Sequence, residues 1–373
     1  MRRIAILFVS ALMCVFTCGL MFAGVATPAP ATRRMTVEQL EQALRAVQGK
    51  RDGKIAEMLT GVELNERLTP DLLSRWEAKL PGEKSRRSLL VIADKAAFLD
   101  PPAKEIPVLP EPDFAVQSRI MAMAVEYTTK TIKKLPNFFA RRDTVFYEDD
   151  PPQVLENMAR TLVPYQPMHQ VNRSVETVLY RDGKEVVDAA NPKRMKYDPK
   201  AATLTTHGVF GPILSNTLVD AANGTVNWSH WEQGPSGPVA VFHFSVPQEK
   251  SHYQVEFCCF LEGPGQNNVF KKVPAYHGEI AVDPNDGTIF RLSLVADLDP
   301  VDPVGISNIL VEYASVEIGG KSYICPVRSV SMWVAGGVFA DSHQVLLNDV
   351  DFAQYHLFRS ESRVLFGNEP ITP

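Results

Sequence analysis

Residues Tyr276 to Leu292 read YHGEIAVDPNDGTIFRL and carry the most informative pattern in this chain. Near its centre, Asp283 can accept a hydrogen bond from a nearby backbone amide, Pro284 fixes φ, and Gly287 supplies a positive φ. These residue types at this spacing predict a five-residue turn that closes with a bulge. The stretch therefore predicts a β-hairpin.

Both arms of this hairpin alternate in character, and a period of two is the pattern of a strand buried on one face. One face of the first arm carries Tyr276, Gly278, Ile280 and Val282. The second arm alternates Arg291 and Ser293 with the apolar residues Phe290, Leu292 and Leu294. We expect each arm to present its apolar face to a core.

The sequence of this hairpin resembles that of the central hairpin of periplasmic lipoprotein carriers and sensors of the LolA, LolB and RseB type. Residues 133–147, KKLPNFFARRDTVFY, similarly resemble the first helix and first strand of that superfamily. In outline the resemblance covers Phe114 to Phe358, and it implies a strongly curved, incomplete antiparallel barrel with an apolar concave face. Turn chemistry alone would give similar residues in another all-β domain, which is the alternative interpretation.

The remaining sequence divides into segments of different composition. Residues 32–99 carry helical stripes and caps, such as the capping box of Thr36 and Gln39, and predict a small helical bundle. Residues 100–113, DPPAKEIPVLPEPD, predict an extended linker that separates this helical module from residues 114–373. After a long helix capped by Asp113, strands joined by short turns indicate an antiparallel meander. The predicted class is α+β, with a helical bundle followed by a curved antiparallel sheet, an incomplete barrel, and a packed helix.

The N-terminus predicts export. Arg2 and Arg3 precede an apolar run that starts at Ile4 and reaches about Ala26, which is the layout of a secretory signal peptide over residues 1–31. We therefore expect a periplasmic or secreted protein. An uncleaved inner-membrane anchor is the alternative, because the run reaches the ~20 residues that span a bilayer. With 38 basic and 43 acidic side chains, the chain is mildly acidic, which argues against nucleic acid as a partner.

The side chains that could take part in catalysis form no catalytic pattern. The eight histidines include no pair at zinc-hydrolase spacing, and the sequence has no Gly-x-Ser-x-Gly motif and no phosphate loop. We expect Trp228 opposite His243 and Val241 opposite His230 on paired strands, and hence cross-strand packing. We predict no catalytic residue, no metal site, no cofactor and no enzymatic activity.

Three cysteines follow the signal segment: Cys258, Cys259 and Cys325. Adjacent cysteines on one strand point to opposite faces, so only one of the first two can face Cys325. Buried free thiols are the favoured interpretation, and a disulfide across a strongly curled sheet is the alternative.

Apolar strand faces supply the functional hypothesis. In a half-barrel covered only by helices, part of the inner face becomes a cavity for an apolar ligand. The candidate ligand-binding residues are Trp228, Phe242, Phe244, Phe257, Phe290, Leu292 and Leu294. A short amphipathic segment supplies the candidate lid residues Ile213, Leu214 and Leu218.

The function that these residues predict is a periplasmic binding or carrier protein that holds a lipid or a lipidated peptide. Its helical module would dock an envelope protein. One alternative is a structural or sensor protein that acts through protein contacts and has a filled sheet interior. A hydrolase is the second alternative.

Overall fold

The computed structural model describes residues 33–151, 153–155, 161–186, 209, 212–261, 267–336 and 343–358. The predicted signal peptide, residues 1–31, lies outside the described residues. None of the helices in the described ranges combines the length and the apolar character that crossing a membrane requires.

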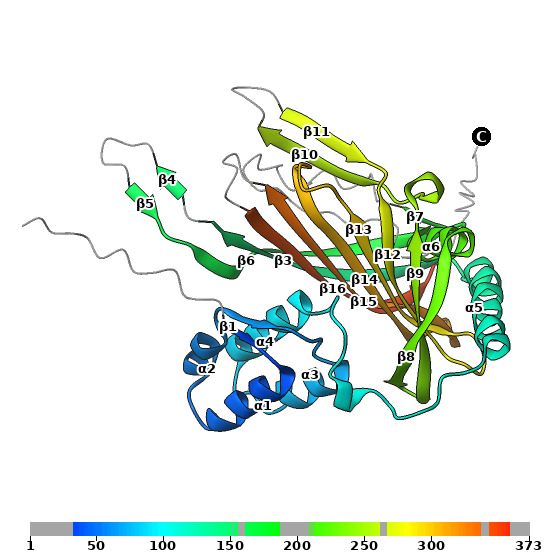
Figure 1. Ribbon diagram of the computed structural model, residues 1–373, viewed down its shortest axis with the longest axis horizontal. Helices are drawn as coiled ribbons and strands as arrows, with labels where there is room; N and C mark the ends of the chain where they lie inside the picture. Colours follow the sequence, from blue (N-terminus) through cyan, green and yellow to red (C-terminus); the bar gives the residue numbers. More distant parts are fainter. Residues whose placement is uncertain are drawn as a thin grey trace, which may run out of the picture. The chain divides into compact units, whose positions relative to one another are not determined.

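A ten-stranded antiparallel sheet dominates the fold, and its strand order is β7-β6-β3-β16-β15-β14-β13-β12-β9-β8. The sheet curves strongly but does not close into a barrel (Figure 1). The predicted α+β class and curved antiparallel sheet are confirmed. Its strands are β3 (Phe138–Asp150), β6 (Gln166–Arg181), β7 (Lys184–Val186), β8 (Thr225–Gly234), β9 (Gly237–Val246), β12 (Ala275–Val282), β13 (Ile289–Asp297), β14 (Val304–Ile318), β15 (Lys321–Gly336) and β16 (His343–Leu357).

The sheet has an inner and an outer face. The inner face carries Phe242, Tyr276, Ile280 and Leu292, all buried in one large core. Two helices, α5 (Phe114–Lys134) and α6 (Pro212–Asn223), contribute to this core and cover the inner face. Toward its other end the inner face is covered by β10 (Val255–Leu261), which pairs with β11 (Asn267–Lys272). The outer face carries the alternate residues, including His243, Glu279 and Arg291.

The predicted hairpin forms between β12 and β13. The amide of Asp283 donates to the carbonyl of Thr288 at 2.8 Å, and the amide of Gly287 donates to the carbonyl of Asp283 at 3.0 Å. Gly287 has a φ of +79°, as the turn requires. A Cβ at this position would lie 2.7 Å from the backbone nitrogen of Ala124 and still closer to the carbonyl group of Met123. The turn therefore packs directly against the backbone of α5.

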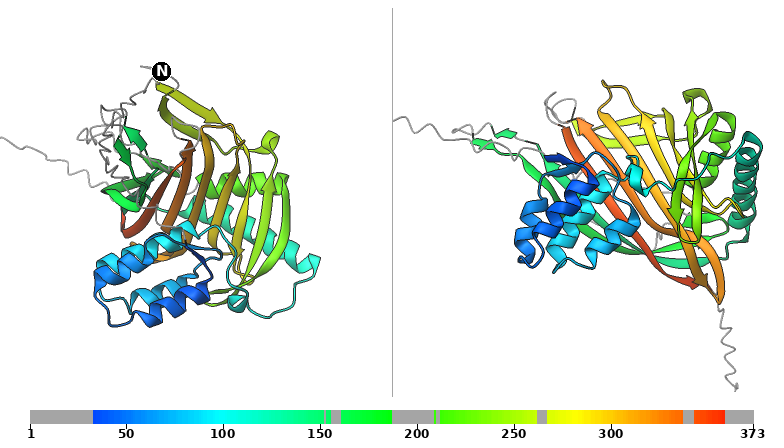
Figure 2. Two further views of the ribbon diagram at one scale, coloured as in Figure 1. Left: turned by 60° about the vertical axis from the view of Figure 1, so that its left-hand side comes forward. Right: turned by 60° about the horizontal axis from the view of Figure 1, so that its bottom comes forward.

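Four helices and two short strands form the helical module, here residues 33–99. They enclose a core of their own, in which the indole of buried Trp76 donates to Glu41 at 3.1 Å. The predicted capping box of Thr36 and Gln39 is present. The elements are β1 (Arg33–Met35), α1 (Val37–Ala46), α2 (Asp52–Leu59), β2 (Val62–Leu64), α3 (Pro70–Glu77) and α4 (Glu83–Lys95), and Figure 2 shows the helices grouped beside the sheet.

The linker does not keep the helical module away from the sheet, contrary to our expectation. Arg328 on β15 forms ion pairs with Asp94 of α4 and, at 3.0 Å, with Asp349 of β16. Beside this bridge, Val91 of α4 packs with Tyr147 and Leu347 on the outer face. One partly buried guanidinium thus pairs with two buried carboxylates, and burial raises the pKa of Asp94 and of Asp349 even though Arg328 opposes the shift. The module is fixed to the outer face by both charge and apolar contact.

Gly287→Ala should lower the free energy of unfolding by about 2 to 5 kcal/mol. It would hold an alanine in the left-handed region of the backbone, and the new Cβ would clash with α5. Gly183→Ala is the matched control, since Gly183 has a φ of +81° and no atom within 4 Å of a built Cβ. The control should cost about 1 to 2 kcal/mol. Urea unfolding measures both variants, and equal losses would contradict the packing of the turn against α5.

Arg328→Met should cost about 3 to 5 kcal/mol at pH 7, because it leaves Asp94 and Asp349 buried without their cation. The folded pKa of each carboxyl already lies above its unfolded value, so protonation stabilises the folded state as the pH falls. Because Arg328 lowers the pKa of both carboxyls, its loss raises these pKa values further, so the variant gains more stability than the unaltered protein as the pH falls and its deficit should shrink between pH 7 and pH 5. Arg87→Met, which removes an exposed pair with Glu83, should cost less than about 0.5 kcal/mol at either pH. A deficit that does not change with pH would contradict this account of the bridge.

Candidate functional site

A small cavity of about 40 Å³ lies between α5, α6 and the inner face. Its walls are mostly apolar, and they come from α5, α6 and the strands β13, β14 and β15. The lining residues are Tyr127, Thr128, Thr131, Leu135, Leu214, Ile289, Tyr313, Ile324, Cys325 and Pro326.

Three of the polar groups that line this apolar cavity are buried. The hydroxyls of Thr128 and Tyr313 are buried, and neither has a hydrogen-bond partner within the described ranges. A buried hydroxyl without a partner costs about 1 to 3 kcal/mol, so such a group fits a site that is completed by a polar ligand atom. The third group is the thiol of Cys325, which is free; burial raises its pKa to about 12, so it is protonated at neutral pH.

An outer basin of about 250 Å³ adjoins the cavity. It shares Tyr127, Thr131 and Ile324 with the cavity and adds Lys134, Ser322 and Tyr323. The ammonium group of Lys134 is on an exposed side chain at the end of α5. The two spaces together form a site with an apolar inner end and a polar, cationic outer end.

Helix α6 is held to the sheet near its C-terminal end. The carboxylate of Asp220 is fully buried and accepts hydrogen bonds from the Tyr276 hydroxyl at 2.8 Å and from the His252 amide at 2.8 Å. Its other oxygen lies 2.5 Å from Nδ1 of His252. Leu214, six residues earlier and therefore about 9 Å along the helix, lines the cavity. The anchored end and the cavity-covering end of α6 are thus different ends.

The predicted ligand-binding residues divide between the two faces. Phe242, Phe244, Leu292 and Leu294 are buried in the inner core, and Trp228 packs edge-on against Phe242 with ring centroids 5.6 Å apart. These five side chains fill the core beside the helices, and none of them is among the residues that line the cavity.

Phe290 does not share the face of Leu292, which corrects our prediction. The register shifts between Ala281 and Val282, where Ala281 pairs with Arg291 and Val282 pairs with Ile289. Phe290 is the extra residue of this bulge, and it packs with Val239, Val241 and Ala281 on the outer face. The side chain of Phe257 lies outside the described residues, as do those of Cys258 and Cys259.

Of the predicted lid residues, Leu214 lines the cavity, Leu218 is buried in the inner core, and Ile213 packs against it. Thr128, Tyr313 and Cys325 were not among the residues that we predicted for a site from the sequence. A signal for α5 was nevertheless present, because Tyr127, Thr131 and Leu135 recur at intervals of four residues and lie on one side of a helix.

The histidines of β8 and β9 belong to a polar cluster on the outer face. His230 lies opposite Val241, as predicted, but His243 lies opposite Asn227 and not Trp228, because a bulge follows Trp228. The predicted packing of His243 on Trp228 is therefore wrong. Instead, Nε2 of His230 lies 2.9 Å from Glu232. Glu232 also pairs with Arg67 of the helical module and, at 2.7 Å, with Arg291.

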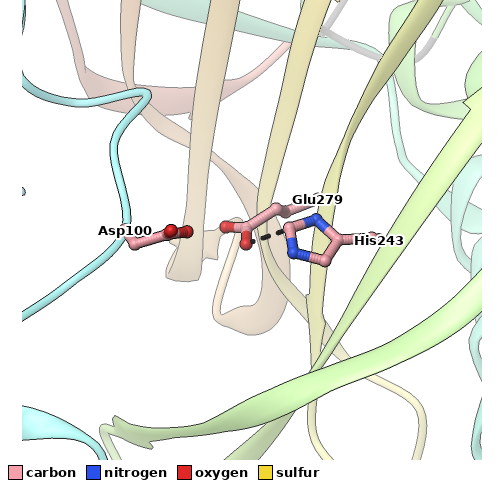
Figure 3. A group of neighbouring side chains, drawn as sticks. All are labelled: Asp100, His243 and Glu279. Carbon is pink, nitrogen blue, oxygen red and sulfur yellow. Dashed lines mark ion pairs between the residues drawn. The ribbon is translucent and has the colours of Figure 1, made fainter. Parts of the chain in front are cut away.

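Next to this cluster, Asp100, His243 and Glu279 place one potential metal-ligand atom each within 4.8 Å of one another (Figure 3). We predicted no metal site from the sequence. The three residues are far apart in sequence and come from the linker, β9 and β12, so no short sequence motif predicts them as a group.

Comparisons with known proteins give one structural likeness. No protein-family model matches the sequence, and no curated protein matches it. Among solved structures, the chain is similar to a LolA superfamily protein from Nitrosomonas europaea, with 9% sequence identity and a TM-score of 0.26. The match covers 65% of this chain and 94% of that chain. This superfamily is the one that the hairpin resembles, but a TM-score this low carries no argument about function.

Asp220→Asn should lower the free energy of unfolding by about 1.5 to 3 kcal/mol, because an amide nitrogen cannot accept the hydrogen bonds that the buried carboxylate accepts. Asp297→Asn is the control, since Asp297 pairs with His277 at 2.8 Å at an exposed position. It should cost less than about 1 kcal/mol. Hydrogen exchange of residues 212–223 should accelerate only in Asp220→Asn. Unchanged exchange in α6 would contradict its anchoring by Asp220.

Proposed function

We propose that this protein is an exported binding or carrier protein that holds the apolar chain of a lipid or a lipidated peptide. The chain would lie between α5, α6 and the inner face of the sheet. The observation that carries the proposal is the cavity, which is apolar at its inner end and continues into a basin that exposes Lys134.

The polar groups of the site fit an amphiphile. An acyl chain would contact Leu135, Leu214 and Ile289 at the inner end. Its polar head would stay in the basin, where Lys134 attracts an anionic group and Ser322 can donate a hydrogen bond. The unpartnered hydroxyls of Thr128 and Tyr313 would receive a polar atom such as an ester oxygen. A purely polar ligand would leave the apolar walls uncompensated.

The size of the cavity requires a movement. Pockets for small molecules typically measure roughly 300 to 1,000 Å³, whereas the cavity measures about 40 Å³. A chain can therefore enter only if a covering helix moves away from the sheet. We propose that α6 moves at the end that carries Leu214, while Asp220 holds its other end.

A structural or sensor protein that acts through protein contacts is the second candidate. It is favoured by the dense packing of Phe242, Phe244 and Leu292 in the inner core, which fills most of the space under the helices. In this case the small cavity would be a packing defect. The helical module would remain the surface for an envelope protein in either candidate, and the predicted export would place both in the periplasm or outside the cell.

Thr131→Trp should block the passage between the basin and the cavity, because Thr131 lines both. We expect the purified protein to bind the fluorescent probe N-phenyl-1-naphthylamine and the variant to bind it at least about tenfold more weakly, a change of 1.4 kcal/mol. Thr129→Trp is the matched control on the exposed side of α5 and should bind like the unaltered protein.

Two outcomes would overturn the carrier proposal. The first is an unaltered protein that binds no probe and carries no lipid detectable by mass spectrometry after purification from the envelope. The second is equal probe binding by Thr131→Trp and Thr129→Trp. Either result would leave the structural or sensor role as the better account.

A further inference from the structure

A gap of ionic size separates three side chains on the outer face. Nδ1 of His243 lies 3.6 Å from Oε1 of Glu279, and the carboxylate of Asp100 completes the group within 4.8 Å (Figure 3). The distance of 3.6 Å exceeds that of a hydrogen bond. Ligands bound at 2.0 to 2.2 Å from a tetrahedral zinc ion lie about 3.4 Å apart. The two side chains are therefore spaced like ligands of one cation.

The buried oxygen of Glu279 points to the same conclusion. Oε1 is buried and has no hydrogen-bond partner in the part of the chain that the structure describes. The other oxygen, Oε2, is held by the guanidinium of Arg291 at 3.1 Å. This pairing leaves Oε1 facing His243. Metal-binding carboxylates are commonly oriented in this way, by a hydrogen-bond partner that does not itself bind the metal.

Backbone contacts position the other ligands. The carbonyl of Asp100 accepts the amide of Arg67 at 2.7 Å, which holds the start of the linker beside the sheet. His243 and Glu279 are direct cross-strand partners on β9 and β12, so their side chains leave the same face side by side. The carboxylate of Asp100 lies within 4.8 Å of the other two ligand atoms on an exposed side chain, so a shift of this side chain would bring it to a zinc bond length.

The net charge of the neighbouring side chains is compatible with a bound cation. Three carboxylates, Asp100, Glu232 and Glu279, lie with two guanidinium groups, Arg67 and Arg291, and with two histidines. With the histidines neutral, this cluster carries one net negative charge.

We propose that Asp100, His243 and Glu279 bind a divalent transition-metal ion, with water completing a tetrahedral site. Zinc fits best, because an imidazole and two carboxylates suit it and because calcium and magnesium prefer oxygen ligands alone. The ion would join the start of the linker to β9 and β12 and so fix the helical module on the outer face. This role is independent of the inner cavity.

Isothermal titration of the purified, chelator-treated protein with zinc chloride tests the site. We expect one zinc ion per chain and a rise in the melting temperature. His243→Ala and Glu279→Gln should weaken zinc binding by more than about tenfold, since even removal of an outer partner has that effect. Cobalt substitution should give the visible absorption of a tetrahedral site, and this absorption should be lost in both variants.

His277→Ala is the matched control. His277 is on β12, the strand of Glu279; its side chain is 52% exposed like that of His243, and it pairs with one carboxylate, Asp297. This variant should bind zinc like the unaltered protein. No zinc binding by the unaltered protein, or equal losses in His243→Ala and His277→Ala, would overturn the proposal. Circular dichroism verifies folding, and probe binding by His243→Ala should be unchanged, which separates this test from that of the carrier function.

Discussion

The antiparallel pairing of β16 with β3 is the interaction on which the rest of the structure depends. It runs from Phe138 opposite Leu357 to Glu148 opposite Leu346 and joins the last strand of the meander to the first strand of the sheet. Because α5 leads directly into β3, this pairing also sets where α5 crosses the inner face. Asn137 secures the junction, since its carbonyl accepts the amide of Phe358 and its side chain accepts the amide of Asp182.

The two faces of the sheet are stabilised by different kinds of interaction. On the inner face, burial of apolar side chains under α5 and α6 supplies the driving force. On the outer face, Arg328 and Glu232 each bind groups from the helical module and from other strands. A buried ion pair adds little net stability, but removal of one partner leaves the other charge buried and uncompensated. Arrangements that keep each pair together are therefore favoured. The outer face therefore orients the module, whereas the inner face holds the apolar volume.

This division places the two proposed sites on opposite faces. An amphiphile would use the inner cavity and the basin at Lys134, and its entry would depend on how α6 moves about Asp220. A metal ion would use the ligands at the start of the linker and would act on the position of the module. The hydroxyls of Thr128 and Tyr313 on one face and Oε1 of Glu279 on the other share one property: each is buried and lacks a hydrogen-bond partner among the described residues.

Features that depend on neighbouring residues could be predicted from the sequence. The turn at Asp283 and Gly287, the capping box at Thr36 and the antiparallel strands follow from local backbone chemistry and from a period of two. The bulge that turns Phe290 outward, the cavity, and the contact of Arg328 with Asp94, which lies 234 residues away in sequence, became visible only in the folded chain. Local patterns state which residues are apolar or charged, but they do not state which distant partner each one meets, because that choice depends on strand register and on how helices pack over a curved sheet.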